Sequence, residues 1–342
     1  MIEIKQLIRP NILALKPYSS SRELHSGREG ILLDANENPY GMLNRYPDPY
    51  QRALKNKLAI LKGVAQENIF FGNGSDEVID LAFRIFCNPT VDKALTFSPT
   101  YGMYSVSAAI NNIELISLPL GNDFQINMDK LSTYFNDTRI KLIFICSPNN
   151  PTGNLINNSD IMFIINKFKG VVIIDEAYID FANTDSFINL LHSHNNLIVM
   201  QTFSKAWGLA SARLGMAYSN KEIISVYNRV KPPYNVSEIN QQAAIDVLEN
   251  LENYREKLAL INKEKERLKS KLKTINCVKK IYPSDANFLL IEVTDANRLY
   301  KYLVTQRIII RNRDTQIANC LRISIGTAYE NEKLINALRI YI

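Results

Sequence analysis

Lys205 is the residue best suited to covalent chemistry in this sequence. It lies in the segment TFSKAWGLASARLG (202–215), where the hydroxyls of Thr202 and Ser204 precede it and apolar side chains follow it. A lysine amine that is shielded from water has a lowered pKa and can attack a carbonyl carbon. Arg213 adds a planar guanidinium, which together with the two hydroxyls suits a phosphate group.

Two polar turns each follow directly after an apolar run: GNGSDE (72–77) and CSPNNPTG (146–153). In the first, two glycines let the backbone approach a ligand. The free N–H groups at the start of the helix that follows attract an anion such as phosphate. The second turn holds the amides of Asn149 and Asn150 at the sheet edge where α/β proteins bind ligands. For either segment alone, a turn without a ligand is the alternative.

VVIIDEAY (171–178) is a run of four β-branched residues that ends on Asp175. A carboxylate at the end of a buried strand is costly unless it meets a cation or a hydrogen-bond donor. Tyr178 comes three residues later and can reach the same place. An aspartate that only caps the next helix is the alternative for this segment.

All these segments share one position, because each follows a β-like run. From about residue 50 to 220, such runs alternate with helical patterns, which predicts an α/β domain with a mainly parallel sheet. The β-like runs are 69–71, 93–97, 113–118, 140–146, 171–175, 197–203 and 214–219. In a parallel sheet the polar segments gather at one edge, and together they fit pyridoxal phosphate, bound through Lys205 with Asp175 at its pyridine nitrogen.

The C-terminal third has a different pattern. Apolar residues recur at helical spacing over 251–275 with Lys, Glu and Arg between them, which predicts one long amphipathic helix. Strand-like runs follow at 288–293, 307–311 and 320–326. We therefore expect a large cofactor-binding α/β domain at 45–235 and a smaller α+β domain at 236–342, entered by the long helix. An N-terminal arm, 1–44, is expected to join the small domain.

The composition of the 342 residues is that of a globular protein of about two domains. Its net charge of +6 is too small to require a polyanion, and no zinc-ligand spacing or RNA-binding motif is present, so we expect no nucleic-acid partner. The apolar runs are too short to span a membrane.

His192 and His194 look like a polar helix end, so no metal site is expected. The four cysteines are widely spaced, which is typical of reduced thiols in a cytoplasmic protein.

The sequence resembles the fold-type I, class II pyridoxal-phosphate-dependent aminotransferases over nearly its whole length. The motifs that carry the resemblance include LDANENPYG, RYPDP (45–49), GNGSDE, SPTYGMY (98–104), CSPNNPTG, IDEAYIDF, TFSKAWGLASARLG, PSDANFLL (283–290), IIIRN and LRISIGT. The N-terminal motifs and RYPDP favour members that act on L-histidinol phosphate. The implied reaction is amino transfer between L-histidinol phosphate and 2-oxoglutarate, which forms imidazole acetol phosphate and glutamate in histidine biosynthesis. The alternative is another enzyme of this fold, such as a threonine-phosphate decarboxylase or an aromatic-amino-acid aminotransferase.

The resemblance also implies roles for individual residues. Lys205 would bind the cofactor and move the proton, with Asp175 at the pyridine N–H and Tyr178 at the 3-hydroxyl oxygen. The other cofactor contacts would be the N–H groups of Ser75 and Asp76, Tyr101 stacked on the ring, Asn150 at the 3-hydroxyl, and Thr202, Ser204 and Arg213 at the phosphate.

Three further implications concern the partner subunit, the substrate and two departures from the family. Tyr46, in RYPDP, would reach the cofactor phosphate of a neighbouring subunit, which implies a homodimer. The anionic end of the substrate would bind Arg322, with Tyr18, Asn36 and Arg311 near it. The chain departs from the family at Gln201, where many relatives carry Arg, and at Trp207, where Phe is commoner.

Overall fold

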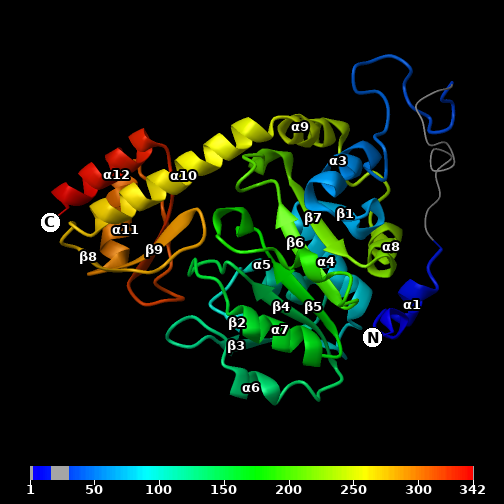
Figure 1. Ribbon diagram of the computed structural model, residues 1–342, viewed down its shortest axis with the longest axis horizontal. Helices are drawn as coiled ribbons and strands as arrows, with labels where there is room; N and C mark the ends of the chain where they lie inside the picture. The colour runs from blue at the N-terminus through cyan, green and yellow to red at the C-terminus, as the bar shows by residue number, and fades with distance from the viewer. Residues whose placement is uncertain (1–2, 17–30, 342) are drawn as a thin grey trace.

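A computed structural model describes residues 3–16 and 31–341 of the chain (Figure 1). Its centre is a seven-stranded sheet with the order β1-β7-β6-β5-β4-β2-β3. The strands are β1 (Ile69–Asn73), β2 (Lys93–Ser98), β3 (Glu114–Pro119), β4 (Ile140–Cys146), β5 (Val171–Asp175), β6 (Leu197–Thr202) and β7 (Leu214–Ser219). β7 pairs antiparallel with both β1 and β6, and the other pairs are parallel. The prediction of a mainly parallel α/β sheet is confirmed.

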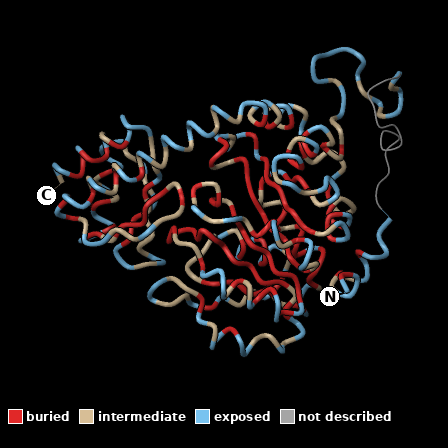
Figure 2. The backbone as a smooth tube through the Cα atoms, in the orientation of Figure 1, coloured by how far each residue is buried: buried red, intermediate tan, exposed pale blue. Residues whose placement is uncertain are grey.

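Helices cover both faces of this sheet, so the central strands β4, β5, β6 and β7 are almost wholly buried, whereas the edge strand β3 is largely exposed (Figure 2). Alternate residues of a strand point to opposite faces. Accordingly Val172 and Ile174 pack in one core, and Val171 and Ile173 pack in the other. The first core includes α3 (Arg52–Lys62), α6 (Met128–Ser132), α7 (Asn158–Lys167) and α9 (Glu238–Glu249), and the second includes α4 (Ser75–Phe86), α5 (Met103–Ile110) and α8 (Lys221–Val230).

The start of the N-terminal arm packs on the large domain. Ile4, Ile8 and Ile12 are spaced four residues apart and are buried in the second core, and the Arg9 N–H donates to the Ile85 carbonyl at 3.0 Å. This segment includes α1 (Pro10–Leu13). It therefore contacts α4 and α8, whereas we expected the arm to join the small domain. The helix α9 also packs on the large sheet, although it lies within the range we expected to be the small domain.

The small domain is built on an antiparallel sheet with the order β10-β11-β9-β8. The predicted long helix is α10 (Leu251–Leu272), which leads from the large domain into the small one (Figure 1). The other elements are β8 (Val278–Ile281), β9 (Phe288–Val293), α11 (Ala296–Thr305), β10 (Arg311–Asn312), β11 (Cys320–Ser324) and α12 (Ala328–Ile340). The strand expected over 307–311 is reduced to β10, because the N–H groups of Arg307 and Ile308 donate to carbonyls at the end of α11.

Short 3-10 turns complete the fold at Ile4–Gln6, Gln66–Asn68, Ile179–Phe181, Phe187–Leu190 and Ala210–Ala212. Over residues 3–16 and 31–341, none of the helices combines the length and the apolar character that crossing a bilayer requires.

Candidate active site

One cavity of about 350 Å³ brings together most of the residues that the sequence predicted to act together. It is bordered by the ends of β4, β5 and β6, the start of α4, and the small-domain strands β10 and β11. The predicted residues that line it are Ser75, Asp76, Tyr101, Asn150, Asp175, Tyr178, Thr202, Ser204, Lys205, Arg213, Arg311 and Arg322. Cys146, Ala177, Ala210 and Arg313 also line it.

Lys205 lies in the loop after β6 with its ammonium facing this cavity. Its Nζ is 5.6 Å from the centre of the Tyr178 ring, and within the described residues it makes no hydrogen bond or ion pair. Burial lowers the pKa of Lys205, and the positive charge of Arg322 lowers it further. The amine is therefore poised to lose its proton and act as a nucleophile or base.

Asp175 ends β5 and is only 3% exposed. Its two oxygens accept hydrogen bonds from the Tyr104 hydroxyl at 2.7 Å and from the Ala177 N–H at 3.1 Å. Burial raises the pKa of Asp175, and these two hydrogen bonds oppose the rise. We did not predict Tyr104 as a residue that supports Asp175. The sequence signal for it was its position three residues after Tyr101 in SPTYGMY, and the rings of the two tyrosines pack edge to face with centres 5.7 Å apart.

The start of α4 is shaped to approach an anion. Gly74 precedes the helix in a left-handed conformation, φ 76°, and no side chain caps the first-turn N–H groups. A Cβ atom on Gly215 of β7 would lie 2.2 Å from the Ser75 nitrogen, so only glycine fits there. The Arg213 guanidinium donates to Asp76 at 3.1 Å beside these N–H groups.

Three arginines from the small domain form the opposite wall. Arg311 on β10 is paired with Arg322 on β11, and the Arg322 guanidinium donates to the Asn150 side-chain oxygen. We did not predict Arg313 as a site residue. The available signal was its spacing from Arg311, because residues two apart in an extended segment point to the same side. Burial lowers the pKa of Arg313 to about 10, and the charges of Arg322 and Arg311 lower it further. Within the described residues, no carboxylate forms an ion pair with any of these three arginines.

Two predicted site residues of the described chain, Asn36 and Tyr46, are not in this cavity. Asn36 and Tyr46 line a separate cavity of about 370 Å³, and the Tyr46 ring stacks on Tyr234 with centres 4.4 Å apart. Tyr18 lies outside the described residues. Within the described residues, a single chain therefore forms the Lys205 cavity without Asn36 and Tyr46.

Gln201 and Trp207, the two departures from the family, occupy buried positions beside the site. The Gln201 amide donates to the Glu176 carboxylate at 2.9 Å, which also accepts from the Ser186 hydroxyl at 2.5 Å and the Phe187 N–H at 2.7 Å. Trp207 stacks on Tyr254 with ring centres 3.8 Å apart. Burial raises the pKa of Glu176 to about 7 despite the three donors.

This buried carboxyl predicts a pH dependence of stability. In the folded protein the Glu176 carboxyl keeps its proton up to about pH 7, whereas its ordinary pKa, which applies to the unfolded chain, is 4.5. Because the folded state then binds more protons than the unfolded chain, stability should fall as the pH rises through this window, on the order of 3 kcal/mol from this group. Glu176→Gln removes the titration. The free energy of urea unfolding, measured at pH 5 and pH 8, should therefore change less in the variant than in the wild type.

Glu249→Gln provides the control, because Glu249 is an exposed carboxylate paired with Lys57. It should keep the wild-type difference between the two pH values. Equal pH dependence in the wild type and Glu176→Gln would contradict the prediction.

The donor set of the cavity fits a planar carbonyl compound that carries a phosphate, and pyridoxal phosphate has this chemistry. The first-turn N–H groups of α4 and the Arg213 guanidinium suit the phosphate. Asp175 offers a buried carboxylate for a ring N–H, and Lys205 offers an amine for the carbonyl carbon. Burial raises the pKa of Tyr178, so its phenol keeps the proton that a ring oxygen can accept.

Comparison with known proteins gives a consistent result. Residues 29–338 match the family described as aminotransferase class I and II. Proteins named histidinol-phosphate aminotransferase are similar over full length: that of Cytophaga hutchinsonii is 48% identical and covers 99% of both chains, and that of Christiangramia forsetii is 50% identical and covers 98% of this chain and 97% of its own.

Solved structures agree in fold. The histidinol-phosphate aminotransferase of Clostridium acetobutylicum has a TM-score of 0.80 at 26% identity, over 89% of this chain and 97% of that one. The enzyme of the same name from Sinorhizobium meliloti, solved with pyridoxal 5'-phosphate, has a TM-score of 0.79 at 21% identity, over 97% and 96%.

Proposed function

The chain belongs to the aminotransferase class I and II family, and we propose that it transfers the amino group between L-histidinol phosphate and 2-oxoglutarate. The observation that carries the substrate assignment is the wall of three arginines, Arg311, Arg313 and Arg322, which faces Lys205 across the cavity. A guanidinium binds either a phosphate or a carboxylate through two parallel hydrogen bonds. Three of them without a carboxylate partner in the described residues suit the dianionic phosphate of one substrate and the carboxylates of the other.

The cofactor, pyridoxal phosphate, supplies a carbonyl that takes up the amino group and a ring that accepts electrons from the substrate carbon. In our proposal the first-turn N–H groups of α4, with Thr202, Ser204 and Arg213, bind its phosphate. Asp175 would hold the proton on the ring nitrogen, Asn150 and Tyr178 would bind the 3-hydroxyl oxygen, and Tyr101 would stack on the ring. The Lys205 amine would take up the proton of the substrate carbon at Nζ as a base and would release it again as an acid.

A substrate panel tests this function. With 2-oxoglutarate as acceptor, we expect rapid glutamate formation from L-histidinol phosphate and slow formation from phenylalanine. Activity with phenylalanine but not with histidinol phosphate would instead support an aromatic aminotransferase. Carbon dioxide release from threonine phosphate would support the decarboxylase.

We further propose a homodimer in which Tyr46 reaches the cofactor phosphate of the partner. The segment before Tyr46 extends away from the large domain (Figure 1), and its apolar side chains are strongly exposed in a single chain. Ile31 is 89% exposed, Leu33 88% and Met42 100%. Apolar side chains exposed together in this way mark a protein interface. A second copy of the chain would cover them and would bring Tyr46 to a site that it does not reach in its own subunit.

Mixed dimers test the crossing of Tyr46. Tyr46→Phe removes only the hydroxyl and should weaken cofactor affinity about tenfold, the effect of losing one hydrogen bond to a charged group. In a heterodimer of Lys205→Ala and Tyr46→Phe subunits, the lysine-bearing site receives Tyr46 from the other subunit. That site should show wild-type cofactor affinity by absorbance titration. Affinity as weak as in the Tyr46→Phe homodimer would mean that Tyr46 acts within its own subunit.

We also propose a cytoplasmic location. The four cysteines, Cys87, Cys146, Cys277 and Cys320, are buried and none forms a disulfide. Free thiols of this kind are typical of proteins that work in a reducing compartment.

A further inference from the structure

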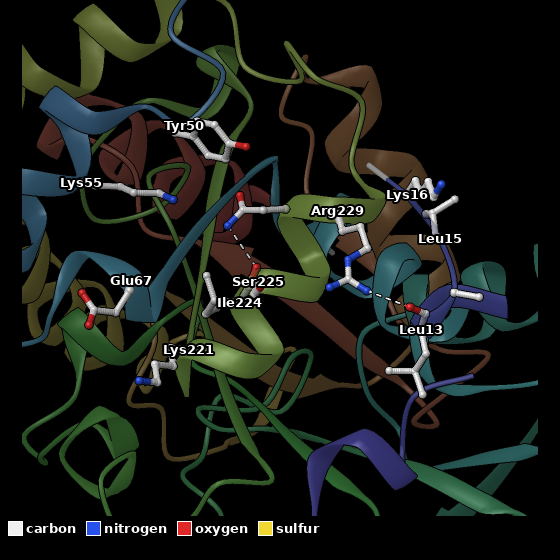
Figure 3. Close-up of a pocket in the computed structure, with 12 residues that line it drawn as sticks. Leu13, Leu15, Lys16, Tyr50, Lys55, Glu67, Lys221, Ile224, Ser225 and Arg229 are labelled. Atoms are coloured by element: carbon white, nitrogen blue, oxygen red, sulfur yellow. Dashed lines mark hydrogen bonds between the residues drawn. The ribbon is translucent and has the colours of Figure 1, made fainter. Parts of the chain in front are cut away.

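A second cavity of the large domain lies between the N-terminal segment, α3 and α8, and it is separate from the Lys205 cavity (Figure 3). Its volume is about 630 Å³, within the range of pockets that hold small organic ligands. Leu13 to Lys16 form one wall, and Ile224 to Arg229 of α8 form another. The two cavities share no lining residue.

Lys55 is the unusual residue of this cavity. It lies on α3 and is only 6% exposed, and its ammonium points into the open space (Figure 3). Within the described residues it has no ion pair and no side-chain hydrogen bond. Burial and the charge of Lys231 lower the pKa of Lys55 to about 8, and the carboxylate of Asp48 opposes the fall only in part. A buried ammonium without an acceptor is costly, and an anion in the cavity would offset that cost.

The other charged groups around the cavity are mostly cations. Lys16, Lys221 and Arg229 line it together with Lys55, against a single carboxylate, Glu67. Arg229 donates through Nη1 to the Leu13 carbonyl at 3.2 Å and so fixes the N-terminal wall (Figure 3). Its guanidinium has further N–H groups for a ligand.

The neutral side chain of Asn228 indicates a second group that the ligand carries. Asn228 donates through its amide nitrogen to the Ile224 carbonyl at 3.0 Å, which fixes the orientation of the side chain. Its oxygen is buried and has no hydrogen-bond partner within the described residues. Such an acceptor needs a donor, for example a hydroxyl group.

We propose that this cavity binds a small phosphorylated molecule that carries a hydroxyl group. The phosphate lies at Lys55, between the cations of α8 and the N-terminal segment, and the hydroxyl donates to the Asn228 oxygen. This site is distinct from the one that binds the reacting substrate.

Isothermal titration of the cofactor-loaded enzyme with glycerol 3-phosphate tests the proposal. Arg322→Gln weakens phosphate binding in the active site, so the binding that remains reports the second site. Adding Lys55→Met should weaken the remaining binding at least tenfold, the loss expected for a hydrogen bond to a charged group. Lys57→Met is the matched control, since Lys57 is on the same helix but pairs with Glu249 at 2.7 Å; it should leave this binding unchanged.

A second variant guards against misfolding of Lys55→Met. Lys221 is exposed at the rim, so Lys221→Ala should fold normally and weaken glycerol 3-phosphate binding several-fold. Inorganic phosphate should bind more weakly than glycerol 3-phosphate, because it cannot place a hydroxyl at Asn228 while it contacts Lys55. Remaining binding that is equally tight with and without Lys55→Met, or no remaining binding in Arg322→Gln, would overturn the proposal.

Discussion

Lys205→Ala should lower kcat for amino transfer from L-histidinol phosphate by about 10⁴-fold or more, because one side chain supplies both the amine that binds the cofactor and the group that moves the proton. The position of Lys205 supports both tasks. Its ammonium faces the cavity without an ion pair in the described part of the chain, and burial lowers its pKa toward the neutral amine. The measurement is single-turnover and steady-state glutamate formation by the purified variant.

Two controls separate lost chemistry from lost folding. Lys301→Ala changes an exposed lysine of α11 and should keep wild-type turnover. Added methylamine should restore part of the activity of Lys205→Ala, since a small amine can enter the vacated space and carry the proton. Turnover by Lys205→Ala within a hundredfold of the wild type, without added amine, would reject the assigned role.

Asp175→Ala should lower kcat about 10³-fold, the order of effect seen when a preorganised charge partner is removed from an active site. The negative charge of Asp175, at the end of β5, is what favours a protonated ring nitrogen on the cofactor. Asp175→Asn keeps the shape and a hydrogen-bonding oxygen but loses the charge, so its loss of turnover should be nearly as large. The measurement is kcat, together with the absorbance of the bound cofactor.

Tyr104→Phe separates the effect of the Asp175 charge from the effect of the hydrogen bond that Tyr104 donates to it. It removes the 2.7 Å hydrogen bond to Asp175 but leaves the carboxylate, so we expect a decrease in kcat of only about tenfold. If Asp175→Asn retained activity within tenfold of the wild type, a role for the charge would be contradicted.

Much of the large domain could be predicted from the sequence because its central strands are buried on both faces. Near-continuous apolar runs of this kind, such as 140–146 and 171–175, coincide with β4 and β5. The structure brings the glycine-rich and proline-rich turns that we singled out to one cavity. Pattern alone does not determine the order of strands or the direction of β7, since those depend on contacts between segments far apart in the chain.

The missed features have similar causes. Arg313 lies in an extended segment too short to show strand periodicity, and Tyr104 supports Asp175 across 71 residues of sequence. The arm that contains Ile4, Ile8 and Ile12 has an apolar face, but the sequence does not say which of two domains will bury it. The role of Tyr46 was implied by the resemblance of RYPDP, and it stays a prediction because it requires a second chain.

The contact between β7 and α4 limits how this enzyme can be engineered. In a saturation library at position 215, even alanine places its Cβ atom 2.2 Å from the main-chain nitrogen of Ser75. Relief of this clash requires β7 and the start of α4 to move apart. Variants selected for a different cofactor or substrate should therefore vary at the arginine wall and retain glycine at 215. Directed evolution should therefore find few tolerated changes where β7 meets the start of α4, and more at the arginine wall.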